Sequence, residues 1–157
     1  MNSDSLKKCT ALKQNFLKYW LSVILWMGVM FWVSTGTFSS EHTSRFIVPL
    51  LHFLFPWLLP QDVDMMHELT RKTGHVIEYF ILGLLLFRAF RSDSSQGWRP
   101  RWAIYTVIGV IIYAVSDEFH QLFVAARGAS LVDVGIDSAG GILSQIAVML
   151  RPLLLKK

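Results

Sequence analysis

Long apolar stretches alternate with polar segments along the chain. There are four of them, residues 16–33, 72–90, 102–124 and 131–150, and the second reaches this length only by including the polar residues at its start. A helix needs about 20 largely apolar residues to cross the hydrocarbon core of a bilayer. The pattern therefore predicts an all-α integral membrane protein with four transmembrane helices, and we expect a single membrane domain over residues 1–157. No small-residue cleavage site follows Trp32, so we expect the first stretch to be retained as a helix.

A shorter apolar segment, residues 46–59, lies between the first two long stretches and contains Pro49 and Pro56. It is too short to span a bilayer and too apolar for open water. We expect an interfacial or re-entrant helix here, lying as a lid across the polar side chains of the other helices. The alternative is a fifth, poorly formed spanning segment.

Composition supports a membrane location. Hydrophobic residues make up 53% of the chain and charged residues 17%, with a mean hydropathy of +0.43. Soluble domains carry roughly a quarter charged residues. The net charge is +4, and because the basic residues flank the apolar stretches, they favour contacts with anionic headgroups over nucleic acid. We therefore expect membrane lipids as partners and no nucleic acid. The single cysteine, Cys9, excludes an internal disulfide and a CxxC site.

The distribution of basic residues predicts the orientation in the membrane. Eleven of the fifteen Lys and Arg residues lie near the two termini or around the connection between the second and third stretches. The other four are Arg45, Arg71, Lys72 and Arg127. Because cytoplasmic segments carry an excess of Lys and Arg, we expect a multi-pass protein of the cell membrane with both termini in the cytoplasm.

Polar side chains interrupt the second, third and fourth stretches at the end predicted to face outward. They are Lys72, His75, Glu78, Tyr79, Asp117, Glu118, His120, Gln121, Arg127, Asp133 and Asp137. An ionisable side chain at the centre of a bilayer costs about 2.5–3.5 kcal/mol, so such residues pair, reach water or hold a ligand. Five of them are acids and only two, Lys72 and Arg127, are bases. We predict that these residues form a ligand-binding cluster.

Helical spacing indicates which of these residues can meet, because residues three, four or seven apart share a face. Asp133 and Asp137 form one such pair. The glycines at 140–141 that follow them are expected to allow close helix packing. The first ion pairs that we expect between helices join Lys72 to Asp117 and Arg127 to Asp133.

Three segments carry a resemblance to a known family. They are Lys-Thr-Gly-His-Val-Ile-Glu-Tyr at 72–79, Ser-Asp-Glu-Phe-His-Gln at 116–121 and Arg-Gly-Ala-Ser-Leu-Val-Asp at 127–133. Together they resemble the VanZ-like family, named after the accessory protein linked to teicoplanin resistance in enterococcal glycopeptide-resistance clusters. Residues 31–34 resemble the ending of that family's first helix, and the resemblance covers roughly residues 30–145. It implies a polytopic protein of the Gram-positive cell envelope, associated with resistance to teicoplanin and related lipoglycopeptide antibiotics. Asp137 stands where the family often has Asn.

Three functions fit these residues. The first is recognition of an anionic envelope lipid, a glycolipid or a cell-wall precursor, with Lys72 and Arg127 holding phosphate or carboxylate groups. The second is an intramembrane enzyme acting on a lipid-linked substrate, with Asp117, Glu118 and His120 as catalytic candidates and His120 as a base oriented by Asp117. A divalent cation could assist such chemistry, but no metal, cofactor or hydrolase motif identifies one. The third is a salt-bridge network that fixes helix packing, which the excess of acids over bases disfavours.

Overall fold

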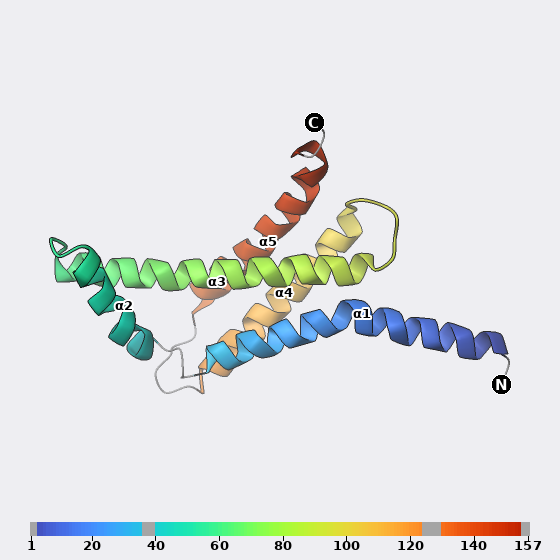
Figure 1. Cartoon of the computed structure of the whole chain (residues 1–157), viewed down its shortest axis with the longest axis horizontal. Coiled ribbons are helices and arrows are strands. Elements are labelled where there is room, and N and C mark those ends of the chain that lie inside the picture. The colour runs from blue at the N-terminus through green and yellow to red at the C-terminus, as the bar shows by residue number, and fades with distance from the viewer. Residues whose placement is uncertain (1–2, 36–39, 124–129, 155–157) are drawn as a thin grey trace.

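The computed structural model describes residues 3–35, 40–123 and 130–154, and every element in them is helical. The helices are α1 (Ser3–Ser34), α2 (Ser40–Leu54), α3 (Pro60–Arg91), α4 (Pro100–Gln121) and α5 (Leu131–Leu154). Figure 1 shows the N-terminal end of α1, the C-terminal end of α5 and the α3–α4 connection toward one end of the molecule, which we call the termini end. The opposite end, where α2 meets the start of α3, is the polar end.

Four of the helical segments are long and apolar enough to cross a membrane, and they are residues 16–34, 60–91, 100–121 and 131–152. Large apolar side chains remain exposed on them, for example Leu25 at 62% and Ile112 at 65%. Apolar surface of this extent is unfavourable in water but is solvated by lipid chains, whereas the backbone polar groups are satisfied within each helix. The predicted fold class, an all-α protein with four transmembrane helices, is confirmed.

α3 begins at Pro60, twelve residues before its predicted start at residue 72. α1 likewise begins at Ser3, thirteen residues before its predicted start at residue 16. Proline is well suited to the first turn of a helix, since its fixed φ is already helical and its missing N–H is not needed there. At 1.5 Å per residue the 32-residue helix is about 48 Å long, well beyond a hydrocarbon core of about 30 Å. The charged residues between Pro60 and residue 72 interrupt the apolar pattern of the sequence but not the helix, which was the cause of the wrong boundary. α4 and α5 begin and end within about one turn of their predicted apolar stretches, and α1 ends within one residue of its own.

The segment predicted over residues 46–59 is the helix α2, which lies earlier in the chain. It contains Pro49 and ends before Pro56. At 15 residues it is about 22 Å long, too short to span a bilayer. Among the described helices it contacts α3 alone, as Figure 1 illustrates. The predicted lid across three helices is therefore wrong in extent, since α2 covers only the first part of α3.

α3 is the centre of the bundle and contacts each of the other four helices. Tyr79 and Leu82 of α3 pack in a buried core with Val110 of α4. The glycines of α5 allow it to lie directly on its neighbours. A Cβ on Gly140 would lie 2.5 Å from the carbonyl oxygen of Val76, where α5 meets the backbone of α3. The predicted close packing at the glycines is confirmed, and it brings the polar residues of α5 against those of α3.

Candidate functional site

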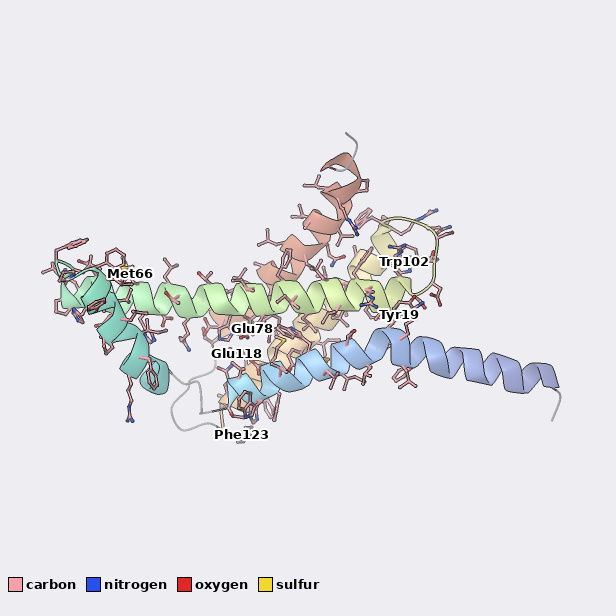
Figure 2. The ribbon with its side chains drawn as sticks, in the orientation of Figure 1. Tyr19, Met66, Glu78, Trp102, Glu118 and Phe123 are labelled. Carbon is pink, nitrogen blue, oxygen red and sulfur yellow. The ribbon has the colours of Figure 1, made fainter. Side chains whose placement is uncertain are left out.

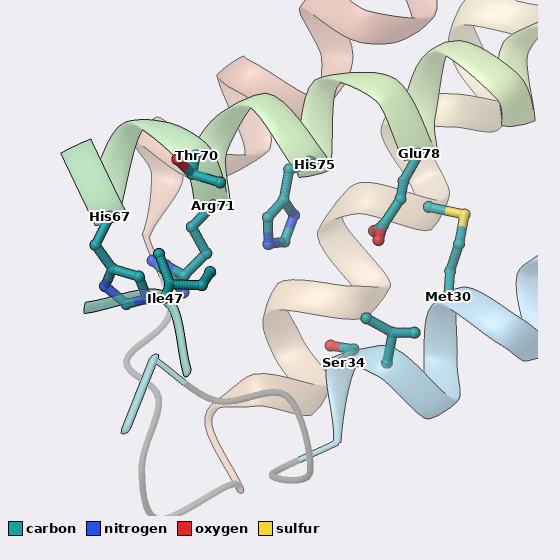
Figure 3. Close-up of a pocket in the computed structure, with 10 residues that line it drawn as sticks. Met30, Ser34, Ile47, His67, Thr70, Arg71, His75 and Glu78 are labelled. Carbon is teal, nitrogen blue, oxygen red and sulfur yellow. The ribbon is translucent and has the colours of Figure 1, made fainter. Parts of the chain in front are cut away.

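One face of α3 carries a row of polar side chains toward the polar end. His67, Arg71, His75 and Glu78 follow one another at intervals of four, four and three residues, so they share a helical face. Figure 3 shows them pointing away from α3 in the same general direction. His67 is only 8% exposed. We call these four residues the α3 polar row.

The α3 polar row lines a cavity of about 190 Å³, shown in Figure 3. Other walls of this cavity are apolar, with Met30 and Val33 from α1 and Ile47 from α2. The hydroxyl-bearing Ser34 at the end of α1 also lines it. The cavity, which we call the α1–α3 cavity, is therefore polar along α3 and largely apolar along α1 and α2.

A second and much smaller cavity, of about 10 Å³, lies on the other side of the α3 polar row. This is close to the minimum volume for one water molecule, roughly 10–15 Å³. Its lining comes from α3, α4 and α5 and consists of Arg71, Lys72, His75, Glu118, Gln121, Asp133, Ile136 and Asp137. Arg71 and His75 line both cavities, so these two side chains form the boundary between them.

His75 is paired with a fully buried carboxylate. Its Nδ1 lies 3.3 Å from Oδ1 of Asp137, which is 0% exposed, and the pair is ionic when the imidazole is protonated. The buried Tyr79 hydroxyl lies beside the same carboxylate. A carboxylate removed from water is strongly destabilised unless donors surround it. On the α3 side of the interface with α5, the imidazole of His75 and the phenol of Tyr79 lie beside this carboxylate.

Asp117 is held by a neutral donor. Gln121, one turn later on α4, donates from Nε2 to Oδ2 of Asp117 at 3.0 Å and to Oγ of Ser34 at 3.1 Å. Both Asp117 and Gln121 are buried. This chain of hydrogen bonds ties the end of α4 to the end of α1, beside the α1–α3 cavity.

Glu118 faces α5, about 100° around α4 from Asp117. Its Oε2 accepts a hydrogen bond of 2.8 Å from the backbone N–H of Ser130, directly before α5 begins. The first N–H groups of a helix have no partner inside it, so a carboxylate placed there is favourable. Figure 2 labels Glu118 and Glu78 near the crossing of α3 and α4, while Tyr19 and Trp102 lie toward the termini end.

Two neighbouring bases of α3 share one acid. Arg71 Nε lies 3.4 Å and Lys72 Nζ 3.5 Å from the carboxylate of Glu68 on the same helix. Among the described ion pairs Lys72 contacts Glu68 and not Asp117, so the predicted Lys72–Asp117 pair is wrong. Partly exposed pairs of this kind are worth about 0–1 kcal/mol each. A ligand anion therefore competes with Glu68 for both cations at little cost.

His120 lies apart from the other candidates. Its ring lies at a tilt of 35° to the ring of Phe31 of α1, with 4.5 Å between the ring centroids, and it lines neither cavity. The described contacts of Asp117 go to Gln121, so the proposed His120 base oriented by Asp117 is not formed. The histidine and carboxylate that do meet are His75 and Asp137.

Asp133 lines the small cavity from the first turn of α5, and its backbone N–H donates to the carbonyl of Ser130 at 3.0 Å. Arg127, its expected partner, lies outside the described residues, so the Arg127–Asp133 pair stays a prediction. In the part of the chain that the structure describes, no three His, Cys, Asp or Glu side chains are grouped to hold a metal ion.

A family model described as VanZ/LLP1 matches residues 19–153, nearly the whole chain. The chain belongs to the VanZ/LLP1 family. No curated protein and no solved structure matches it. The match covers residues 19–34 of the first spanning segment, the other three segments completely, and both cavities of this VanZ/LLP1 protein.

Two residues at the site of this VanZ/LLP1 protein, Ser34 and His67, were not among the predicted site residues. His67 lies before residue 72, where the second helix was expected to begin, and was therefore not counted with the polar residues of that helix. Its spacing of four residues from Arg71, and of eight from His75, was the available signal. Ser34 had no such signal, since only the packing of α1 against α4 brings it to Gln121.

Proposed function

We propose that this VanZ/LLP1 protein recognises a phosphate-bearing envelope lipid or a lipid-linked cell-wall precursor at the polar end. The observation that carries this proposal is the α1–α3 cavity, whose α3 wall is polar and whose α1 and α2 walls are largely apolar. An amphiphile has the same division between headgroup and chains. The polar end faces outward in this proposal, as the distribution of basic residues predicts.

The size of the cavity limits what can enter it. Pockets that enclose a whole small molecule measure about 300–1,000 Å³, and the α1–α3 cavity has about 190 Å³. It therefore takes one phosphate or one sugar ring of a headgroup. The chains of the amphiphile would stay in the surrounding bilayer, along the exposed apolar side chains of α1.

The charges around the cavity favour a headgroup with both anionic and hydroxyl groups. Arg71 suits a phosphate because its guanidinium forms two parallel hydrogen bonds, and Lys72 adds a second cation nearby. Glu78 and His75 line the α1–α3 cavity. The Glu78 carboxylate would repel an anion without hydroxyl groups, whereas both side chains can form hydrogen bonds with hydroxyl groups. A glycolipid phosphate or a lipid-linked sugar fits this mixture better than a simple anionic lipid.

The resemblance to the VanZ-like family supports the next part of the proposal, a link to antibiotic resistance. In the Gram-positive cell envelope, occupying or altering such a target would reduce the access of teicoplanin to it. We therefore propose that the protein lowers susceptibility to teicoplanin and related lipoglycopeptides through the headgroup that the cavity binds.

Native mass spectrometry of the purified protein with its co-purified envelope lipids tests the proposal. Arg71→Gln removes the guanidinium that lines the cavity, and we expect about a tenfold loss of the retained lipid. Arg45→Gln is the matched control, because Arg45 lies exposed on α2 and does not line the cavity. In a Gram-positive host, teicoplanin protection should fall with Arg71→Gln only. Equal lipid retention and equal protection in both variants would rule the proposal out.

A second function is favoured by the His75–Asp137 contact of 3.3 Å. A buried carboxylate that orients an imidazole is the arrangement of a general base, and His75 also lines the α1–α3 cavity where the headgroup would lie. In this alternative the protein hydrolyses or transfers a group of the bound lipid. His75→Gln would then retain the lipid and abolish its turnover, whereas a wild-type protein that leaves the bound lipid chemically unchanged would exclude this function.

A further inference from the structure

A larger cavity lies at the termini end, on the opposite side of the protein from the proposed headgroup site. Its volume is about 430 Å³, within the range of pockets that hold a small molecule. Arg88 and Arg91 from the last turn of α3 line it together with Arg151 from the last turn of α5. The hydroxyl-bearing Tyr19 and Ser92 complete its polar wall.

The three arginines meet without a described counter-charge. None of the described ion pairs includes Arg88, Arg91 or Arg151, and no acid lines the cavity. The acid that follows α3, Asp93, accepts from Lys18 Nζ at 2.9 Å and from the Tyr19 hydroxyl. Like charges that converge on one concave space repel each other, and a bound anion removes that repulsion.

Two of the guanidinium groups are oriented by contacts that do not neutralise them. Arg88 lies over the ring of Tyr19, 5.6 Å from its centroid, and Arg91 Nε donates to the carbonyl of Ser94 at 3.2 Å. Both contacts leave the terminal nitrogens of the guanidinium group able to donate. Paired N–H donors of this kind match the oxygens of a phosphate.

Basic residues at this end have two ordinary explanations. Cations are favourable in the last turn of a helix, and they are common where a helix leaves the membrane. Both explanations account for each arginine separately. Neither accounts for arginines of α3 and α5 lining one cavity.

The rest of the cavity wall is apolar. Leu84 and Phe87 of α3 and Val148 of α5 contribute to it. We propose that this cavity binds the phosphate group of an anionic phospholipid, with an acyl chain along these three side chains. The site is separate from the α1–α3 cavity, since Arg88 lies about 26 Å along α3 from Arg71.

The full-length protein in nanodiscs of phosphatidylcholine, titrated with phosphatidylglycerol, tests this site. The double variant Arg88→Gln/Arg151→Gln removes two of the three cations. The matched control is Arg99→Gln/Arg101→Gln, which removes the same charge at the same end from exposed residues that do not line the cavity. Native mass spectrometry counts the retained phosphatidylglycerol, and a parallel titration uses inorganic phosphate.

We expect the cavity variant to bind phosphatidylglycerol about 100-fold more weakly, at about tenfold for each arginine, and the control to stay within about twofold of the wild type. Equal losses in both variants would mean only a general surface charge and would overturn the proposal. Binding of inorganic phosphate as tightly as the lipid would assign the site to a soluble phosphate compound instead.

Two further variants keep the result interpretable. If Arg88→Gln/Arg151→Gln does not fold, Arg88→Lys/Arg151→Lys retains the charge and loses the planar donors, and an unchanged affinity in it would contradict the proposed phosphate contacts. Arg71→Gln should leave binding at this cavity unchanged. Loss of phosphatidylglycerol binding in Arg71→Gln would contradict the separation of the two sites.

Discussion

Gly140 decides how closely α5 approaches α3, and Gly140→Ala should separate the two helices. A Cβ at this position would lie 2.5 Å from the carbonyl oxygen of Val76 and 3.2 Å from the backbone nitrogen of Phe80. Non-bonded heavy atoms prefer about 3.5–4.0 Å, so α3 and α5 would have to move apart by about 1 Å. The atoms in the way belong to the backbone, which cannot change its rotamer.

The stability cost of Gly140→Ala can be estimated by comparison with Gly135, five residues earlier on the same helix. Gly135 is exposed and a Cβ there would meet nothing within 4 Å. Gly135→Ala should therefore stabilise the protein by about 0.5–1 kcal/mol through helix propensity alone. Gly140→Ala gains the same amount but adds an overpacking cost of about 1–3 kcal/mol. Because the propensity gain cancels, the difference between the two variants measures the clash itself.

Equilibrium unfolding in detergent micelles, titrated with SDS and followed by tryptophan fluorescence, gives both free energies of unfolding. We expect Gly140→Ala to be less stable than Gly135→Ala by about 1–3 kcal/mol. It should also weaken the His75–Asp137 contact, since Asp137 lies one turn before Gly140 on α5. Equal stabilities of the two alanine variants would refute the close packing of α5 on the backbone of α3.

Three further substitutions test the hydrogen bonds and ion pairs between helices by the same unfolding titration. His75→Ala should lower the free energy of unfolding by about 1–3 kcal/mol, because it leaves the buried Asp137 carboxylate short of a partner. Combining it with Asp137→Asn should lower that free energy by less than the sum of the two single losses, and additive losses would contradict a direct contact. Glu118→Ala should lower the free energy of unfolding by about 1–3 kcal/mol, because the Ser130 N–H loses its acceptor. Glu118→Gln keeps an acceptor oxygen and should lower it less, and equal losses in the two variants would contradict the backbone contact. Tyr113→Phe should lower the free energy of unfolding by about 0.5–1.5 kcal/mol, because the Tyr113 hydroxyl donates to a backbone carbonyl of α1 at 2.7 Å. An unchanged free energy would mean that this hydrogen bond does not stabilise the position of α1.

The acid excess in the polar end shows where counting charges along a sequence is insufficient. The five acids and two bases of the predicted cluster indicated carboxylates without partners. In the structure, the Asp117 carboxylate accepts from the amide of Gln121 and the Glu118 carboxylate from the N–H of Ser130. Neutral donors satisfy a carboxylate without changing the count of charges. For these two residues, the excess of acids over bases is therefore no argument against a purely structural role.

The start of α3 shows a second limit of sequence patterns. Apolar periodicity marks the part of a helix that lies in lipid, and it is silent about a polar extension of the same helix. Residues 60–71 carry several charged side chains, so the apolar pattern stopped at residue 72 while the helix continued back to Pro60. His67 and Arg71 of the α3 polar row lie in that extension.

The sequence by itself determined the number of spanning helices, the family and most residues of the polar end. These depend on local properties, namely the length of apolar stretches and the identity of side chains on each stretch. Only the tertiary structure decided which residues meet. It paired His75 with Asp137 rather than His120 with Asp117, and it placed Arg71 on the boundary of two cavities. The reason is that the rotation and spacing of neighbouring helices are set by packing between them, such as the contact of Gly140 with α3, and the sequence of a single helix does not contain that information.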